Sequence, residues 1–589
     1  MQHLARSLFR IPRSAFLIPY SAFLILLACA RQGAPTGGPK DTFPPVLDTA
    51  ASTPNFSTRF DQKRIELKFD EWLELADAAT QVIVSPPLAK RPEVLLKGKT
   101  VVVNFDKNEV LRPNTTYTLN FGTAVKDFRE RNAVKNLRFV FSTGDFIDSL
   151  SFRGIVLDAF TGDAVENVSV MLYDSDQGRN ADSAVRKERP YYFSRTDKTG
   201  QYEFQNLREG VFRVVAIEDS DLNLKWDGED ERIAFRDSAL SVGDSMRGTV
   251  NLKLFKNRPR FRLAGQTANR YGLVSLGFNA PTDSFETKTL APDGLKTWLE
   301  RTPDSLQLWY DLPNVDTAWS LVFLNAEYGM RNAESDTIEI KKLSRSEFLK
   351  THRLGFADVA PAAKLGRGRV SAAESASLPS SQAAKTVVQV PAKPASLWFN
   401  FPIAAFDTSR WLLSVDSNRL TAFSAMPDSA NLRRFSLAFA WQQSKAHTLT
   451  LLPGALTDFW GTPNADTLRR IFNVLSEKQL GTLTLTLEKL RPGTRYVLQL
   501  LNGTVLEGER AFAAETASTK VTFNQLQVAV YTARLLEDLN GNGRWDTGDF
   551  AAQRQPERLF NKKLDALRAN WEVEATLSTE AVIEKRRKQ

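Results

Sequence analysis

Apolar and polar residues alternate in short runs along residues 43–146, which is the period of a β-strand with one buried face. Residues 65–69 read Ile-Glu-Leu-Lys-Phe, and similar alternation returns at 101–105 and 117–121. A Pro-Asn pair at 113–114 supplies a turn before the last of these runs. Short strands at this spacing, with no helical pattern between them, predict an antiparallel sandwich.

Most of the remaining chain shows the same kind of pattern. Residues 346–394 differ, because Ala, Ser and Pro dominate there and the periodicity is lost, so we expect a linker. The predicted fold class is all-β, with antiparallel β-sandwiches in tandem. The expected modules are a sandwich at 43–146, a second at 147–255, a β domain at 256–345, a sandwich at 395–475 and a last sandwich at 476–589.

Two pairs of these modules share residue patterns. The run Ala124–Phe128 is echoed by Ala455–Phe459. A second pattern is repeated with identical spacing in Phe204, Leu207, Phe212 and Asp219 and in Phe523, Leu526, Tyr531 and Asp538. Such recurrence indicates duplication. We therefore expect 395–475 to repeat the fold of 43–146, and 476–589 to repeat that of 147–255.

The amino-terminal segment has the order of a secretory signal. Three arginines precede an apolar run at 15–28, and a Gly/Pro-rich stretch follows Cys29, the single cysteine. The ending Leu-Leu-Ala-Cys resembles a bacterial lipobox, which implies cleavage of residues 1–28 and acylation of the Cys29 thiol. Residues 29–42 then form a flexible tether. The alternative, an uncleaved transmembrane helix, is disfavoured because the run is short and is interrupted by Pro19.

The composition narrows the possible chemistry. With Cys29 acylated, the body has no thiol for a disulfide, so its domains depend on hydrophobic cores or bound ions. Three histidines in 589 residues make a histidine-based zinc site or a Ser-His-Asp triad hard to assemble. The formal charge falls from +9 to +6 when the three signal arginines are removed. We see no basic face with aromatic platforms, and therefore expect no nucleic-acid partner.

The run from Asp538 to Asp549 has the clearest metal-binding pattern. Side chains with oxygen atoms fall at positions 1, 3, 5, 9 and 12, and Gly543 falls at position 6, which is the order of an EF-hand calcium loop. The expected calcium ligands are Asp538, Asn540, Asn542, the backbone carbonyl of Arg544, Asp546 and Asp549.

An equivalent loop lies in the earlier module. Its expected ligands are Asp219, Asp221, Asn223, Asp227 and Asp230. Leu224 stands where a calcium loop has glycine, so this match is less complete. Neither loop is flanked by amphipathic helices. The alternative is a pair of Asx-rich turns with Trp226 and Trp545 packed beneath them. Calcium is the one cofactor that we expect.

Several motifs resemble known bacterial modules. Residues 35–45 after the lipobox, together with 63–71 and 111–117, are similar to the bacterial Ig-like domain of Bacteroidetes-type lipoproteins. Residues 154–173 and 196–214 resemble the carboxypeptidase regulatory-like, or transthyretin-like, sandwich. The resemblance implies an all-β protein, mostly of a kind without an assigned activity, in which the second module serves as a spacer or binding partner.

We therefore expect a lipid-anchored protein of the cell envelope with a structural, scaffold or adhesion role, and not an enzyme. We expect the outer membrane, with the periplasmic or surface orientation left open, and an unknown protein or polysaccharide partner. One alternative is glycan binding, for which the conceivable aromatic platforms are Trp72, Trp226, Trp411 and Trp460. A second is a glycoside hydrolase that uses two carboxylates.

Overall fold

The computed structural model describes residues 41–134, 137–175, 181–228, 231–243, 249–257, 263–279, 285–290, 294–302, 305–312, 319–325, 335–341, 343–357 and 385–580. The predicted signal, Cys29 and most of the tether lie outside these residues. The chain divides into two compact units, Met1–Ser149 and Leu150–Gln589. Strands dominate both units, so the all-β prediction is confirmed.

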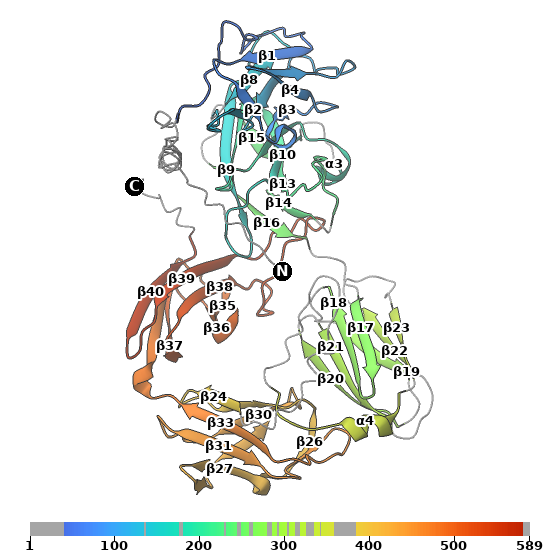
Figure 1. Ribbon diagram of the computed structural model, residues 1–589, viewed down its shortest axis with the longest axis vertical. Helices are drawn as coiled ribbons and strands as arrows, with labels where there is room; N and C mark the ends of the chain where they lie inside the picture. Colours follow the sequence, from blue (N-terminus) through green and yellow to red (C-terminus); the bar gives the residue numbers. More distant parts are fainter. Residues whose placement is uncertain are drawn as a thin grey trace, which may run out of the picture. The chain divides into compact units, whose positions relative to one another are not determined.

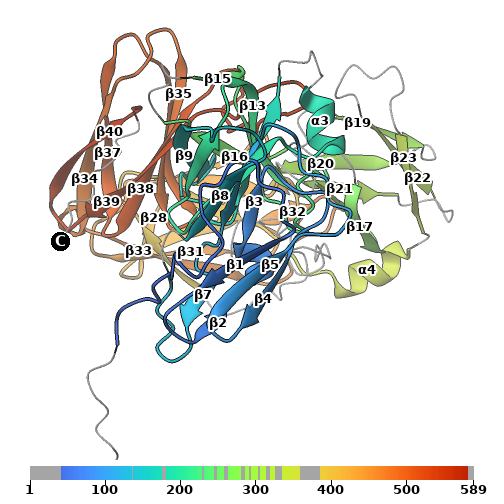
Figure 2. The ribbon, with the colours of Figure 1, turned by 90° about the horizontal axis from the view of Figure 1, so that it is seen from above.

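The first unit is built from short antiparallel strands around one aromatic core. The elements are β1 (Arg64–Lys68), β2 (Leu73–Leu75), α2 (Ala78–Gln81), β3 (Ile83–Ser85), β4 (Glu93–Lys97), β5 (Thr100–Asn104), β6 (Thr116–Asn120), β7 (Val125–Asp127) and β8 (Arg138–Ser142). They form sheets in the orders β1-β5-β4, β3-β6-β8 and β2-β7, and Figure 2 shows the first of these as adjacent blue arrows. Ile65, Leu67 and Phe69 are buried in the core, as the alternation predicts.

The second unit begins with a module at residues 150–256 (Figure 1). Its elements are β9 (Leu150–Asp158), β10 (Ser169–Asp174), α3 (Ala181–Lys187), β11 (Tyr192–Arg195), β12 (Gln201–Leu207), β13 (Gly210–Ile217), β14 (Arg232–Phe235), β15 (Leu240–Val242) and β16 (Leu252–Lys256). β9 pairs antiparallel with β12 and parallel with β16. β10 lies between β11 and β13.

The carboxy-terminal module shares most of this strand pairing. Its elements are η3 (Glu477–Gln479), β34 (Leu480–Glu488), β35 (Arg495–Asn502), β36 (Val505–Ala513), β37 (Ser518–Gln527), β38 (Val530–Glu537), β39 (Leu559–Ala566) and β40 (Glu572–Ser578). β34 pairs antiparallel with β37 and parallel with β40, and β35 lies between β36 and β38. The equivalent pairs β9–β12 and β34–β37 each contain a register shift. This topology agrees with the duplication that the spacing of Phe204 and Phe523 suggests.

Between these modules lies a β domain. Its elements are β17 (Leu263–Arg270), β18 (Leu273–Phe278), β19 (Phe285–Leu290), β20 (Lys296–Thr302), β21 (Ser305–Asp311), β22 (Trp319–Asn325), β23 (Ser335–Ile340) and α4 (Arg345–Thr351). They form the sheets β17-β18-β21-β20 and β19-β22-β23.

The next domain repeats the strand arrangement of the first unit. Its elements are β24 (Lys385–Gln389), β25 (Ala395–Trp398), β26 (Ile403–Phe406), η2 (Thr408–Arg410), β27 (Trp411–Val415), β28 (Asn418–Leu420), β29 (Ser424–Pro427), β30 (Arg434–Ala438), β31 (Ala446–Leu451), β32 (Leu456–Asp458) and β33 (Leu468–Val474). The orders β25-β30-β29, β27-β31-β33 and β26-β32 correspond to β1-β5-β4, β3-β6-β8 and β2-β7. Asp458, which ends β32, faces Ile403 as Asp127 faces Leu73.

The structure differs from the prediction of a linker at 346–394. α4 covers the start of this range, and its Ser344 cap accepts a hydrogen bond from Glu347 N–H. His352 is fully buried against the Asp458 carboxylate, among aromatic rings. β24 pairs in parallel with β33. The sequence pattern did not predict these elements, because α4 is short and the residues of β24 do not alternate between buried and exposed. Residues 358–384 lie outside the described chain.

One hydrophobic core joins the β domain to the domain that follows it. Trp309 and Leu308 of β21 pack in the same cluster as Trp411 and Leu413 of β27. A buried ion pair crosses this core, with Arg433 Nη1 lying 3.1 Å from Glu300 Oε2. Glu300 also accepts hydrogen bonds from the side chains of Asn431 and Trp309. Since both charges are buried, each depends on the other for its compensation.

We expect Glu300→Ala to destabilise this core by about 3–5 kcal/mol, because it leaves the Arg433 guanidinium buried without its carboxylate. Urea unfolding followed by tryptophan fluorescence measures the change. The exposed Glu347–Lys350 pair provides the control, since Glu347→Ala should leave the transition unchanged. Equal midpoints for both variants would show that the buried pair contributes nothing.

Candidate metal centre

Two loops with similar internal hydrogen bonding follow equivalent strands, β13 and β38. In the first, the buried Asp219 carboxylate accepts the N–H groups of Asn223 and Leu224, both at 3.0 Å. In the second, the buried Asp538 carboxylate accepts those of Gly541 at 2.8 Å and Gly543 at 3.0 Å. The first aspartate of each predicted loop therefore fixes the turn around it.

Position 6 of each loop has left-handed backbone geometry. Gly543 has φ +76° and Leu224 has φ +61°. Glycine adopts this region freely, whereas a leucine there has a steric cost of about 1–2 kcal/mol. The loop around Asp219 thus keeps the same turn without the residue that favours it.

A glutamate completes each loop, and sequence reasoning missed both. Glu231 accepts the N–H groups of Ser220 at 3.3 Å and Asp227 at 3.1 Å. Glu557 likewise accepts those of Leu539 at 2.8 Å and Asp546 at 3.0 Å. A signal existed, because a Glu-Asp pair opens each loop and a Glu-Arg pair closes it, at 218–219 and 231–232 and again at 537–538 and 557–558. The different spacing of the two pairs conceals the repeat.

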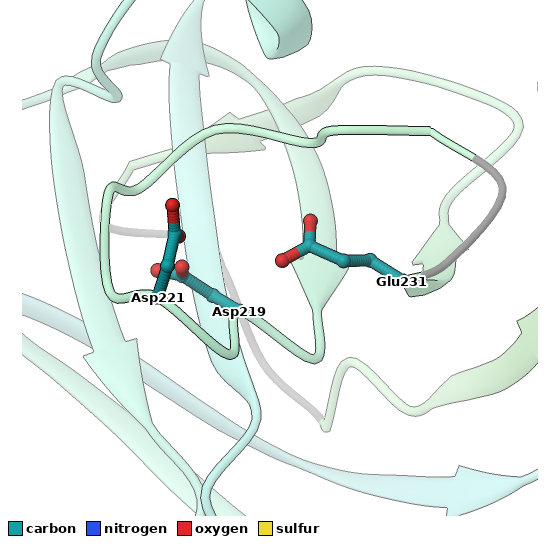
Figure 3. A group of neighbouring side chains, drawn as sticks. All are labelled: Asp219, Asp221 and Glu231. Carbon is teal, nitrogen blue, oxygen red and sulfur yellow. The ribbon is translucent and has the colours of Figure 1, made fainter.

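The first loop gathers three carboxylates. One oxygen each from Asp219, Asp221 and Glu231 lies within 4.8 Å of the others, and Figure 3 shows Glu231 pointing across the loop toward the two aspartates. Burial raises the pKa of Asp219, and the Asp221 carboxyl raises it further. Burial also raises the pKa of Glu231. Carboxyl groups that are buried close together are costly to ionise because their negative charges repel. A hard divalent cation would offset these charges, so the cluster suits such an ion.

The second loop has an amide side chain, Asn540, at the position where the first loop has the carboxylate Asp221. Asn540 and Asn542 donate side-chain hydrogen bonds to Asp546 Oδ2, at 2.6 and 2.8 Å. Burial raises the pKa of Glu557. This loop thus has three carboxylates, from Asp538, Asp546 and Glu557, and two amide oxygens that accept the N–H groups of Asn542 and Arg544. The loop that matched the calcium pattern less completely from sequence is the one with the tighter carboxylate cluster.

The position-12 aspartate of the second loop, Asp549, makes its hydrogen bonds outside the loop. Asp549 accepts a hydrogen bond from Ala552 N–H at 3.1 Å and bridges to Arg554, in a turn of its own. Glu557, not Asp549, accepts backbone N–H groups of this loop, from Leu539 and Asp546. Asp230 lies outside the described residues. The other predicted residues do meet, since Asn223 Nδ2 lies 2.9 Å from both Asp221 Oδ2 and Asp227 Oδ2.

The two loop tryptophans pack as the turn interpretation expects. Trp226 Nε1 donates to the Glu231 carbonyl at 3.2 Å, and Trp545 Nε1 donates to the Glu557 carbonyl at 2.9 Å. Trp226 is buried. The turn interpretation and the calcium interpretation are compatible, since these bonds use backbone groups and leave carboxylate lone pairs available.

The segment that follows the second loop joins the two repeated modules, although they are far apart in the chain. Phe550 is buried against the rings of Trp226, at 5.0 Å between centroids, and Phe235, at 5.4 Å. Phe550 N–H donates to Asn257 Oδ1 at 2.8 Å, and Thr547 Oγ1 donates to the Lys256 carbonyl at 2.6 Å. Both candidate loops therefore border one junction, here called the module junction.

Three of the four tryptophans considered as glycan platforms are buried. Trp226, Trp411 and Trp460 all belong to packed interiors, and only Trp72 of the four is exposed. In the described part of the chain, none of the helices has the length and apolar character needed to cross a bilayer.

Comparison with known proteins identifies one part of the chain. A family model described as a bacterial Ig-like domain matches residues 41–143. No curated protein matches. The major pilin subunit of Bacillus cereus aligns at 9% identity, covering 73% of this chain and 99% of the pilin, with a TM-score of 0.13.

Two Bacteroides proteins also align with low sequence identity and low TM-scores. One is the surface glycan-binding protein SGBP-B of the Bacteroides ovatus mixed-linkage glucan utilization locus, at 10% identity, 72% and 94% coverage and a TM-score of 0.16. The other is a SusE-like polysaccharide-binding protein from the Bacteroides thetaiotaomicron heparin utilisation locus, at 9% identity, 86% and 98% coverage and a TM-score of 0.12. Scores this low carry no functional argument. The family match shows that the first unit contains a bacterial Ig-like domain.

Proposed function

We propose that this chain is a lipid-anchored, non-catalytic scaffold of the cell envelope, whose interlocked modules present interaction surfaces. The module junction carries this proposal. The burial of Phe550 and the hydrogen bonds of Asn257 and Thr547 fix one repeated module on another within the second unit. A protein that orders distant modules in this way is suited to holding a shape.

The anchor rests on the sequence pattern around Cys29. Acyl chains on this cysteine would bury enough methylene groups to hold a large body at a membrane. The outer membrane is the proposed location, because the chain resembles Bacteroidetes-type lipoproteins in its lipobox and in residues 35–45.

We also propose that calcium is a structural cofactor at the two loops. Asp219, Asp221 and Glu231 already face one another, and their oxygens are the ligands that calcium prefers. An ion there would offset the cost of burying like charges and would stiffen the module junction. These carboxylates also hold backbone N–H groups, which suits a structural site better than glycoside hydrolysis.

Replacing Cys29 with Ser should release the protein from membranes, because the serine hydroxyl cannot take the place of the acylated thiol. Fractionation of cells, followed by detection of the protein in soluble and membrane pools, measures this. Gln32→Ser is the matched control, because it introduces the same residue nearby and keeps the thiol, so this variant should stay with the membrane. A Cys29→Ser variant that still sediments with lipid contradicts the anchor.

Calcium should raise the unfolding temperature of chelator-treated protein. A cation at about 100 times its Kd contributes about 2.7 kcal/mol to the folded state. Calorimetry with and without millimolar calcium measures the shift, and Asp221→Asn should reduce it because one carboxylate is lost from the cluster. Asp61→Asn, at an exposed site in the other unit, should leave it intact. Identical scans with and without calcium would leave only the turn interpretation.

Phe550→Ala should weaken the module junction by about 3–5 kcal/mol, since it empties a buried aromatic site. We expect the second unit to unfold at lower urea concentration and in more than one step. Phe146→Ala is the matched control, because Phe146 is an exposed phenylalanine and its loss should change stability by no more than about 0.5 kcal/mol. An unchanged transition for Phe550→Ala would contradict the interlocked scaffold.

A further inference from the structure

The two domains with the same strand arrangement can be compared residue by residue at one edge. Phe128 N–H donates to the Trp72 carbonyl at 2.9 Å, and Phe459 N–H donates to the Pro402 carbonyl at the same distance. Each phenylalanine directly follows the aspartate that ends β7 or β32. Phe128 and Phe459 therefore occupy equivalent positions, and Trp72 is the neighbour of Phe128 across the strand pair.

In the second of these domains, another part of the protein covers this edge. Phe459 is only 4% exposed. The Lys296 ammonium of β20 lies 4.2 Å from the centre of the Phe459 ring, and it donates to the Phe459 carbonyl at 2.7 Å. The adjacent Trp460 donates to the Tyr310 carbonyl at 2.9 Å. Here the edge serves as a docking face for a β-sheet that places a cation on the aromatic ring.

In the Ig-like domain of the first unit, the equivalent residues face solvent. Phe128 is 67% exposed and Trp72 is 65% exposed. The backbone after Phe128 and the Trp72 ring are nevertheless held in place. The buried Asp127 carboxylate accepts the N–H groups of four consecutive residues, 129–132, at 2.6–3.0 Å. A Cβ atom at Gly98 would lie 3.3 Å from the Trp72 ring, so the ring rests on the glycine backbone.

Several carboxylates lie near Glu71 at this edge, together with the Arg131 guanidinium, whose Nε lies 3.0 Å from Glu74 Oε2. Burial raises the pKa of Glu71, the neighbour of Trp72, and the nearby Asp70, Asp41, Asp127 and Glu130 carboxylates raise it further. A cation placed beside Glu71 would relieve this repulsion. A positive charge brought to the aromatic faces would be attracted both by the rings and by these carboxylates.

We propose that Trp72 and Phe128 form a docking face for a protein partner that places a lysine or arginine side chain on their rings. This inference rests on the interaction role proposed above and supplies the chemistry of the partner. The covered edge around Phe459 shows the same kind of contact made within the protein. Aromatic side chains such as these have few rotatable bonds and are typical of protein interfaces.

Binding of octalysine to the full chain tests the charge chemistry. We expect Trp72→Ala and Phe128→Ala each to weaken binding about two- to fivefold, in line with the energy of a cation on an exposed aromatic face. Phe128→Leu should weaken it similarly, because leucine retains apolar bulk but lacks the ring. Trp571→Ala is the matched control, since Trp571 is exposed but Arg568 already covers its ring. Equal affinities for all variants, or full binding by Phe128→Leu, would overturn the proposal.

Photo-crosslinking in the producing cells tests the partner class. With p-benzoylphenylalanine at position 128, we expect an adduct with a protein, attached beside a lysine or arginine, and a loss of at least about fivefold in yield after Glu71→Lys. The same probe at Phe146, exposed on the same domain, should not give that adduct. An adduct with polysaccharide, an adduct that is insensitive to Glu71→Lys, or no adduct would overturn the inference. Membrane release of Cys29→Ser is read separately, so failure of the docking face and failure of the anchor are distinguishable.

Discussion

Buried aspartates that accept backbone N–H groups hold several loops of this protein in place. Asp127, Asp458, Asp219 and Asp538 each end a strand or closely follow one, and each carboxylate organises the loop after it. A buried charge is costly unless hydrogen bonds compensate it. Because the single cysteine of this chain is expected to carry lipid, these hydrogen bonds take the place of the disulfide bonds that stabilise many small secreted domains. The same interaction therefore shapes both the exposed aromatic edge and the candidate cation loops.

Equivalent positions in the similar modules make different contacts. The edge at Phe459 is closed by Lys296, whereas the edge at Phe128 is open. The loop at Asp538 is followed directly by the segment that forms the module junction. The loop at Asp219 takes part in the junction through Trp226, which packs against Phe550 of that segment. The modules with similar strand arrangements thus carry equivalent surfaces that make different contacts.

Much of the fold was predictable from sequence because strands with one buried face impose a period of two. The alternation at 65–69 and the spacing of Phe204 and Phe523 identified strands and a repeat that the structure contains. The β domain expected at 256–345 was harder to delimit, since it shares its core with residues 385–475 and has no boundary in composition. The end of the expected linker was misplaced because β24 presents exposed residues to solvent on both faces.

The candidate site was predictable only as far as local spacing reached. Asp219, Asp221, Asn223 and Asp227 lie within one loop, so their order in the sequence reports their proximity. Glu231 and Glu557 come from just before the next strand, after loops of different length, and their role depends on the fold. Trp226 and Trp460 are likewise packed against neighbouring modules, through Phe550 and Tyr310, which no local pattern describes.

The parallel pairing of β34 with β40 has a mechanical consequence. These are the first and last strands of their module, and they are in register from Thr482 and Glu572 to Glu488 and Ser578. Since they run in the same direction, the chain enters the module at one end and leaves it at the other. Tension along the chain therefore pulls the two strands past each other and loads their hydrogen bonds together, so the module resists stretching more strongly than a hairpin that opens one bond at a time.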